Sequence, residues 1–381
     1  DYEAVIKDLS EIIRINPESI LAYYNRGNIY FSKGEWESAI GEWSRAIELD
    51  PNQAVLYINR GVANSKLGKY NEAIADFEKA LANHPNDGAT YNRLAYIYHL
   101  QKNYSKAAEN YTKALAYIQN DPQIYFNRGN IYRLLQKPQE AIKDFEQAIR
   151  LKPDFVETLN NRGNLYLSLK KYDQAIRDFS QVIAKDPDYV LAYYNRALAY
   201  IQKKEYKLAE KDLTFAIQHE PEMATSYQQR ASVYFNLKEY DKAIKDWTTY
   251  LKFKPDEAKV HYSIGLCHLM RKEYDQAIKA LTKAIQLDNQ NYSAYYQRGN
   301  AYLLLEKYEE AAEDYSQMIK MQKSGSTDGL DIAYFNRGVC YLNLKKNKLA
   351  IADFQKVVSI INNEQLLKEA KKAIAALSGK N

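Results

Sequence analysis

The chain has 381 residues, 46% of them apolar or aromatic and 27% charged, which is typical of a folded protein. Its 53 basic and 48 acidic residues leave a net charge of +5 without a Lys/Arg block, so we predict no nucleic-acid partner. No apolar run approaches the roughly 20 residues of a membrane-spanning helix, and two cysteines cannot build a disulfide framework.

An internal repeat of 34 residues runs through the chain. Units begin at residues 20, 54, 88, 122, 156, 190, 224, 258, 292 and 331. The last step is five residues longer, and the extra residues fall near 323–329, a Ser/Gly-rich stretch that predicts a surface loop. Repetition at a fixed period indicates stacked supersecondary units rather than several globular domains.

Two small residues stand twelve places apart in every unit. The eighth place is always Gly or Ala and the twentieth is always Ala, as in Gly27 and Ala39. Apolar residues between them recur at three- and four-residue spacing, which predicts helices. Each unit has one break at its middle, as at Gly34, and another at its end, often with Pro, as at Pro51. Each unit is therefore predicted to be two close-packed helices joined by a turn.

The signature residues of the first unit are Tyr23, Arg26, Gly27, Tyr30, Ala39, Trp43, Ala46 and Pro51. This pattern resembles the tetratricopeptide repeat (TPR), and the resemblance covers nearly the whole chain. It implies an all-α fold, a right-handed α-solenoid superhelix of about ten tandem helix-turn-helix units. In this interpretation, residues 1–19 are the second helix of a truncated unit, 20–363 hold the ten repeats, and 364–381 form a capping helix with its tail.

A pair of opposite charges varies together across the ten units. The seventh place is Arg and the twenty-third is an acid in the same eight units, while Leu94 with Asn110 and Ile264 with Ala280 replace both partners in the others. Since neither charge occurs alone, we predict ion pairs between the two helices of a hairpin; the alternative is that these arginines bind an acidic ligand. The predicted structural bridges are Arg26–Glu42, Arg60–Asp76, Arg128–Asp144, Arg162–Asp178, Arg196–Asp212, Arg230–Asp246, Arg298–Asp314 and Arg337–Asp353.

A row of amides marks the predicted binding surface. In the TPR family the first helix of each hairpin lines the concave face, so the resemblance implies that places two, five, six, nine and twelve face a ligand. Amides recur at places six and nine and aromatic rings at place five. A carboxamide both donates and accepts hydrogen bonds, so such a row can hold an extended peptide main chain. The predicted contacts are Asn25, Asn28, Asn59, Arg93, Phe126, Asn127, Asn130, Asn161, Asn164, Tyr194, Asn195, Gln229, Tyr262, Tyr296, Gln297, Asn300 and Asn336.

The amide row resembles part of the asparagine ladder in the repeat arm of O-linked N-acetylglucosamine transferases. Six hydrogen bonds at about 1 kcal/mol each barely exceed the roughly 2–5 kcal/mol needed to order a flexible ligand, so the aromatic rings would have to anchor it. The alternative is that the amides are solvated or bond to neighbouring helices. A carboxylate clamp of the co-chaperone type is matched only in part, by Asn28, Asn59 and Arg93, because Tyr24 and Ala89 stand where its lysines should be.

No catalytic constellation, metal site or cofactor site is predicted. His261, Cys267 and His268 cluster in the eighth unit, but they occupy places that are packed in the other units, so we expect core substitution rather than a metal site. No Gly-rich phosphate loop follows a strand.

We therefore expect a non-catalytic scaffold or assembly factor that binds an extended segment of a partner protein, without direct membrane insertion and with self-association also allowed. The alternative is the specificity arm of a larger enzyme, such as a glycosyltransferase, whose catalytic part is absent from this chain. We expect a soluble protein of the cytoplasm or periplasm. The sequence does not decide between these compartments, because the N-terminus reads as truncated within a repeat.

Overall fold

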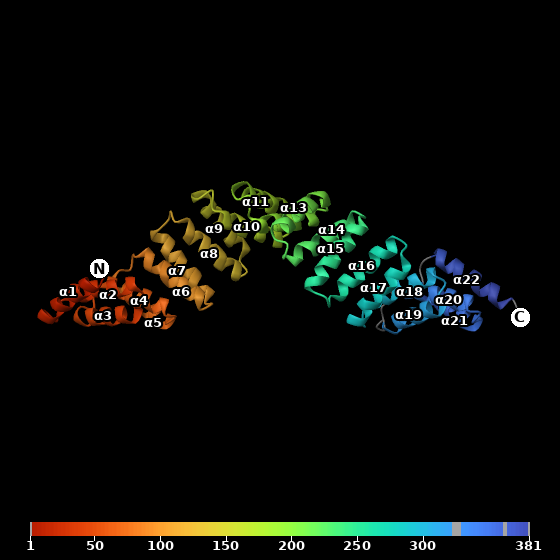
Figure 1. Cartoon of the computed structure of the whole chain (residues 1–381), viewed down its shortest axis with the longest axis horizontal. Coiled ribbons are helices and arrows are strands. Elements are labelled where there is room, and N and C mark those ends of the chain that lie inside the picture. The colour runs from red at the N-terminus through yellow and green to blue at the C-terminus, as the bar shows by residue number, and fades with distance from the viewer. Residues whose placement is uncertain (1, 322–328, 361–363, 380–381) are drawn as a thin grey trace. The chain divides into compact units, whose positions relative to one another are not determined.

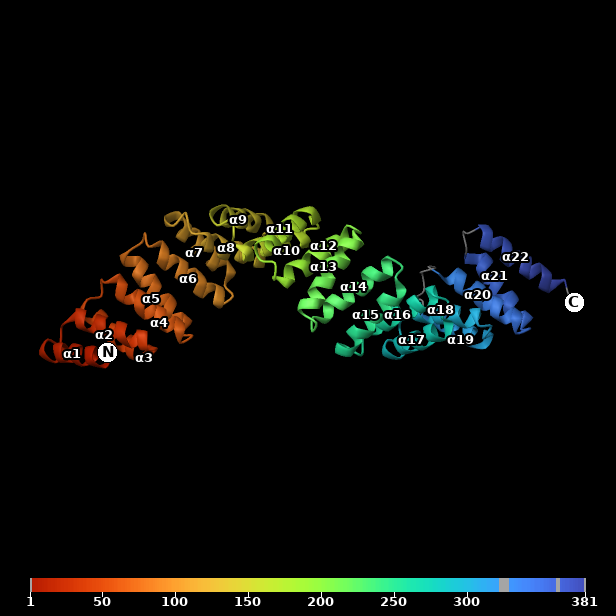
Figure 2. The ribbon, with the colours of Figure 1, turned by 45° about the horizontal axis from the view of Figure 1, so that its top comes forward.

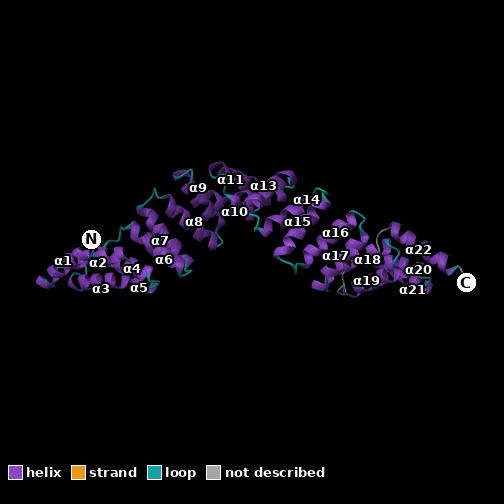
Figure 3. Cartoon of the chain, viewed as in Figure 1, coloured by secondary structure: helices purple, strands orange, loops and turns teal. Residues whose placement is uncertain are grey.

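The structure, a computed structural model, describes residues 2–321, 329–360 and 364–379. The described residues form 22 α-helices joined by short loops (Figure 3). The chain divides into two compact units, residues 1–188 and residues 189–381. Within each unit, successive helices pack side by side in chain order (Figures 1 and 2).

Twenty of the helices form ten hairpins, each with a first helix and a second helix. The first helices are α2 (Ile20–Lys33), α4 (Ala54–Lys66), α6 (Gly88–Leu100), α8 (Pro122–Leu134), α10 (Val156–Ser168), α12 (Val190–Gln202), α14 (Ala224–Asn236), α16 (Ala258–Met270), α18 (Tyr292–Leu304) and α20 (Leu330–Asn343). The second helices are α3 (Trp36–Leu49), α5 (Tyr70–Asn83), α7 (Tyr104–Tyr117), α9 (Pro138–Leu151), α11 (Tyr172–Lys185), α13 (Tyr206–His219), α15 (Tyr240–Phe253), α17 (Tyr274–Leu287), α19 (Tyr308–Met321) and α21 (Asn347–Ile360).

One further helix lies at each end of the chain, α1 (Tyr2–Ile15) and α22 (Glu364–Ser378). The last hairpin begins at Leu330, one residue before the start expected from the repeat, a difference within the usual uncertainty of a helix end. The loop expected near 323–329 lies outside the described residues, apart from Gly329. None of the described helices combines the length and the apolar character that a bilayer-spanning segment needs.

The small residues allow the two helices of a hairpin to touch. A Cβ atom added at Gly129 of α8 would lie 2.7 Å from the ring of Phe145 in α9. Phe145 and Ala141, which stands at the twentieth place, are fully buried. The aromatic ring of Phe145 therefore packs directly on the bare backbone of α8, and a larger residue at Gly129 would push these two helices apart.

Each hairpin turn contains one residue in the left-handed backbone region. Gly34 closes α2 with a φ of +81°, its N–H donating to the carbonyl of Phe31, while the N–H of Glu35 donates to Tyr30. These are the hydrogen bonds of a Schellman-type helix end. At the equivalent place the later turns carry Lys102, Gln136, Lys170, Lys204, Lys238, Lys272, Glu306 and Lys345, with φ between 57° and 61°. A non-glycine residue in this region costs roughly 1–2 kcal/mol, so the rest of the hairpin must hold the turn in place.

Candidate functional site

All the predicted contact residues lie on first helices. Sixteen of the seventeen are half-buried, and Arg93 is exposed. Half-buried amides and rings are accessible from solvent on one side and packed on the other, which suits a contact surface better than a core.

Amides of neighbouring first helices bond to one another. In each pair, Nδ2 at the sixth place of one hairpin donates to Oδ1 at the ninth place of the hairpin before it. The pairs, with the donor first, are Asn59–Asn28 at 3.2 Å, Asn161–Asn130 at 3.0 Å and Asn336–Asn300 at 3.3 Å. The expected alternative, bonding to a neighbouring helix, therefore applies to these six residues. A carboxamide offers two N–H groups and an oxygen with two lone pairs, so one such bond does not exhaust either partner.

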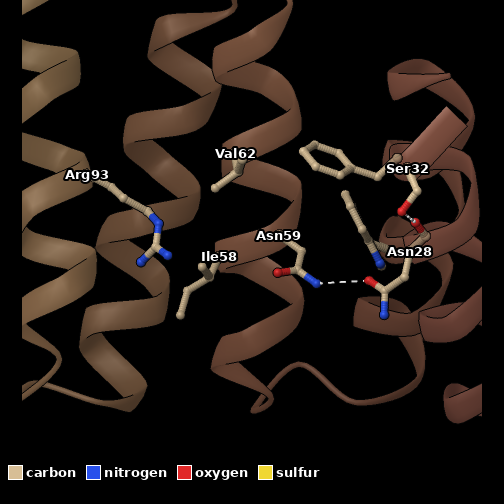
Figure 4. A pocket seen from close by; sticks show the side chains of 8 residues that line it. Asn28, Ser32, Ile58, Asn59, Val62 and Arg93 are labelled. Carbon is tan, nitrogen blue, oxygen red and sulfur yellow. Dashed lines mark hydrogen bonds between the residues drawn. The ribbon is translucent and has the colours of Figure 1, made fainter. Parts of the chain in front are cut away.

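Three successive hairpins within residues 1–188 line one pocket. It has a volume of about 350 Å³ and is bounded by side chains of α2, α3, α4 and α6 (Figure 4). The Asn28–Asn59 pair forms one part of its wall, and the guanidinium group of Arg93 lies on the opposite side. The apolar wall includes Phe31 and Val62. The pocket thus combines apolar surface, main-chain-like amides and one cation.

The described residues that line the pocket include a cationic side chain but no acidic one. Arg93 forms no ion pair with any residue in the described part of the chain, and its side chain is exposed. The pocket therefore offers an uncompensated positive charge beside an apolar surface.

The pocket contains residues that the sequence analysis did not name. Phe31, Ile58 and Val62 stand at the twelfth, fifth and ninth places of their units, which the resemblance assigns to the groove. The signal was therefore present, but a search for amides and charges passes over apolar side chains. Of the predicted contacts, the pocket brings together Asn28, Asn59 and Arg93; the others lie along the first helices outside it.

Each of the eight arginines at the seventh place contacts the acid of its own hairpin. The N–O distances are 2.7–2.9 Å, and the arginine side chains retain 14–23% of their exposure. In the Asp pairs Nε and Nη2 donate to the two carboxylate oxygens, as Arg128 does to Asp144. In the first hairpin only Nη2 of Arg26 reaches Glu42, and Nε of Arg26 has no partner.

Burial and attraction oppose each other in these pairs. Burial raises the pKa of Asp144, although the Arg128 guanidinium lowers it. Burial works against the charge of Arg128, but its hydrogen bonds with Asp144 raise the pKa of Arg128 overall. The rings of Tyr125 and Tyr132 lie 5.8 and 5.6 Å from the Arg128 guanidinium carbon and add cation–π attraction. Arg128 and Asp144 therefore face each other at a mostly buried site, where loss of one partner is strongly destabilising.

The same arginines also reach back to the preceding helix, which the sequence analysis did not anticipate. Nη1 donates to a hydroxyl there at 2.8–3.1 Å. The contacts are Arg26–Ser10, Arg60–Ser44, Arg128–Thr112, Arg230–Thr214, Arg298–Thr282 and Arg337–Ser316. A hydroxyl 16 residues before the Arg, or 21 residues before Arg337, was the available signal, but Ser and Thr are common on helix surfaces. Each such arginine therefore links two units as well as two helices.

The histidines of the eighth unit have separate partners. Nε2 of His261 lies 3.2 Å from the carbonyl of Pro255, and Nδ1 of His268 lies 2.7 Å from Glu273. Both histidines are half-buried rather than in the core, because their polar edges bond near the helix ends. Cys267 is buried, and burial raises its pKa to about 12. Among the described residues, no cluster of three His, Cys, Asp or Glu side chains is placed to hold a metal ion.

Family models of the tetratricopeptide repeat match the chain in tandem. One matches residues 54–87, 122–155, 258–291 and 292–324, and a TPR repeat model matches 27–68, 95–136 and 163–204. Two further tetratricopeptide models match 77–109 and 145–177, and 190–221, 224–257 and 332–364. The matches together span 27–221, 224–324 and 332–364, well over half of the chain. The chain belongs to the tetratricopeptide-repeat family.

Solved TPR structures resemble this TPR chain. The C-terminal part of a TPR repeat-containing protein from Cytophaga hutchinsonii matches with a TM-score of 0.56 and 20% identity over 64% of this chain and 98% of that one. A TPR protein from Parabacteroides merdae matches with a TM-score of 0.46 and 19% identity over 68% of this chain and 99% of that one. YrrB, described as a TPR protein with an unusual peptide-binding site, matches with a TM-score of 0.45 and 24% identity over 48% of this chain and 95% of that one. A search of curated proteins found no match. The predicted all-α TPR solenoid is confirmed.

Proposed function

We propose that this TPR protein is a non-catalytic scaffold that binds an extended segment of a partner protein along its first helices. The observation that carries the proposal is the pocket shared by three hairpins, with its apolar wall, its amide pair and the unpaired guanidinium of Arg93. An extended segment presents main-chain amides and side chains in alternation, so it matches such a surface.

The energetics favour an anchored rather than a purely polar contact. Burying one large apolar side chain against Phe31 and Val62 contributes about 1.5–3 kcal/mol. Each main-chain hydrogen bond to an amide adds about 1 kcal/mol. Ordering the segment removes roughly 2–5 kcal/mol, so a single pocket binds weakly and affinity grows as further hairpins are engaged.

The proposal is tested with peptides selected on the full chain from a displayed library of random 12-residue sequences. Val62→Glu places a charge in the apolar wall, so we expect at least tenfold weaker binding by fluorescence anisotropy. Leu208→Glu, an exposed position on the second helix α13, is the matched control and should leave binding unchanged. Failure to select any peptide, or equal binding by wild type and Val62→Glu, would contradict the proposed function. Circular dichroism checks that both variants remain helical.

A further inference from the structure

Two buried hydroxyls within residues 1–188, those of Tyr111 and Thr158, lack a hydrogen-bond partner among the described residues, and the larger side chain is that of Tyr111. Tyr111 lies in α7, the second helix of the third hairpin, and its side chain is fully buried. Its hydroxyl oxygen has no hydrogen-bond partner among the described residues. Burial raises the pKa of Tyr111, so the group stays a neutral O–H donor. A buried donor without an acceptor is unfavourable, and most proteins avoid it.

The ninth hairpin contains the satisfied version of the same arrangement. Tyr315 occupies the place in its unit that Tyr111 occupies in the third, and it is also fully buried. Its hydroxyl donates to Oδ1 of Asn300 at 2.8 Å. The same Oδ1 accepts from Nδ2 of Asn336, in the tenth hairpin, at 3.3 Å. One amide oxygen thus lies between two donors.

The third and fourth hairpins keep the two donors but lack the oxygen. Asn127 stands where the tenth hairpin has Asn336, but the place of Asn300 is taken by Tyr96, which has no carboxamide. The Asn127 carboxamide interacts with the Tyr111 oxygen from the donor side, a contact that lowers the pKa of Tyr111, but it gives the hydroxyl proton no acceptor. Its Oδ1 already accepts from Gln123 at 3.0 Å, so this oxygen is engaged elsewhere. An acceptor placed between Tyr111 and Asn127 would satisfy both.

We propose that the bound polypeptide supplies this acceptor: a main-chain or side-chain amide oxygen of the ligand binds between the Tyr111 hydroxyl and the Asn127 carboxamide. This inference rests on the proposed function and adds a specific subsite to it. Both protein groups act as donors, so the subsite takes an oxygen acceptor and not an ammonium group or an alkyl group.

The subsite lies next to the pocket that contains Arg93. Tyr96 lies on α6, one helical turn after Arg93, so the subsite continues the pocket towards the fourth hairpin. The Tyr96 side chain is 50% exposed and interacts electrostatically with Tyr111. An exposed side chain changes rotamer rapidly, so Tyr96 can move aside when the ligand enters.

The first test needs no ligand. Tyr111→Phe removes an unsatisfied hydroxyl, so the midpoint of thermal unfolding should stay unchanged or rise, whereas Tyr315→Phe breaks a hydrogen bond and should lower it. Tyr96→Asn supplies the missing oxygen from within the chain and should raise the midpoint, and this gain should disappear in the Tyr96→Asn/Tyr111→Phe double variant. If Tyr111→Phe lowers the midpoint as much as Tyr315→Phe, a water molecule or another group already satisfies the hydroxyl and the proposal is wrong.

The second test uses the 12-residue peptides selected on the full chain. Tyr111→Phe and Tyr96→Asn should each weaken binding about five- to tenfold, as expected for one buried hydrogen bond. Peptides that respond to Val62→Glu but bind both tyrosine variants like wild type would overturn the subsite and leave the proposed function standing. A library that yields no binding peptide would overturn both.

Discussion

The Arg128–Asp144 pair gives the most quantitative prediction. The third and eighth hairpins replace both charges together, the eighth with Ile264 and Ala280. The double change Arg128→Ile/Asp144→Ala would therefore copy an exchange that the chain already tolerates, whereas neither single change has a counterpart among the ten hairpins. We expect each single change to be strongly destabilising and the double change to be mild.

The magnitudes follow from burial. The Arg128 side chain is 16% exposed and that of Asp144 only 6%, so either partner left alone is a mostly buried charge. Loss of one partner of a buried pair costs about 3–5 kcal/mol, and the partial exposure of Arg128 favours about 3 kcal/mol for each single change. The double variant also loses the hydrogen bond to Thr112, so it should cost about 1 kcal/mol rather than the sum.

The pH dependence has a defined sign. With Arg128 replaced by Ile, burial alone acts on Asp144, so the pKa of this carboxyl in the folded variant rises further above its ordinary value. When folding raises the pKa of a carboxyl, the folded protein is stabilised at pH values below the unfolded-state pKa, about 3.9, where the carboxyl is protonated. This stabilisation is lost as the pH rises through the folded-state pKa. Arg128→Ile should therefore be more destabilising at pH 7 than at pH 4.

Urea unfolding followed by circular dichroism measures these free energies. Because a repeat array need not unfold in one step, hydrogen exchange of the amides in α8 and α9 is needed to locate the change. A double variant that costs about 6 kcal/mol, or single variants that cost under 1 kcal/mol, would refute the reasoning.

Three further predictions concern packing, reactivity and the turns. Gly129→Ala should lower stability by about 1–3 kcal/mol in thermal unfolding, since the new methyl group meets a ring at 2.7 Å, whereas Gly41→Ala, with nothing within 4 Å, should raise stability by about 0.5–1 kcal/mol. Cys267 and Cys340, each with its pKa raised by burial to about 12, should resist alkylation at pH 8 in the folded chain and react fully after unfolding; rapid labelling of the native protein would contradict their burial. Lys170→Gly should raise the free energy of unfolding by about 1 kcal/mol, and with it the unfolding midpoint, because glycine adopts a φ of 58° without strain. A loss of stability would show that the lysine side chain contributes to the turn.

Structural features that depend only on residues of one repeat could be predicted from the sequence. The 34-residue period and the pairing of small places indicate the hairpins, because helix periodicity and close packing are local properties. The joint loss of charge at Leu94 and Asn110 pointed to pairing within a hairpin, where the structure places Arg128 against Asp144. The turn at Gly34 carried a glycine signal, but the equivalent turn at Lys102 did not, since only the surrounding helices impose its left-handed backbone.

Features that depend on the offset between neighbouring helices could not be predicted. The bond from Asn59 to Asn28 joins residues 31 apart, an interval that the repeat length alone does not indicate. The unsatisfied hydroxyl of Tyr111 is invisible in sequence, because tyrosine is frequent at many places and the hydroxyl loses its partner through a single missing oxygen at Tyr96.

The hydroxyl contacts of the arginines have a mechanical consequence. Where they occur, pulling one hairpin away from the next must break a charge-assisted hydrogen bond as well as apolar contacts. At the junctions preceding Leu94 and Ile264, the arginine that would resist the separation is absent. Arg162 has Glu146 in place of the hydroxyl, and the opposite charges still attract each other across that junction. In a linear array loaded along its length, every junction bears the same force. Stretching should therefore begin at these two junctions, which would act as the compliant elements of their respective units.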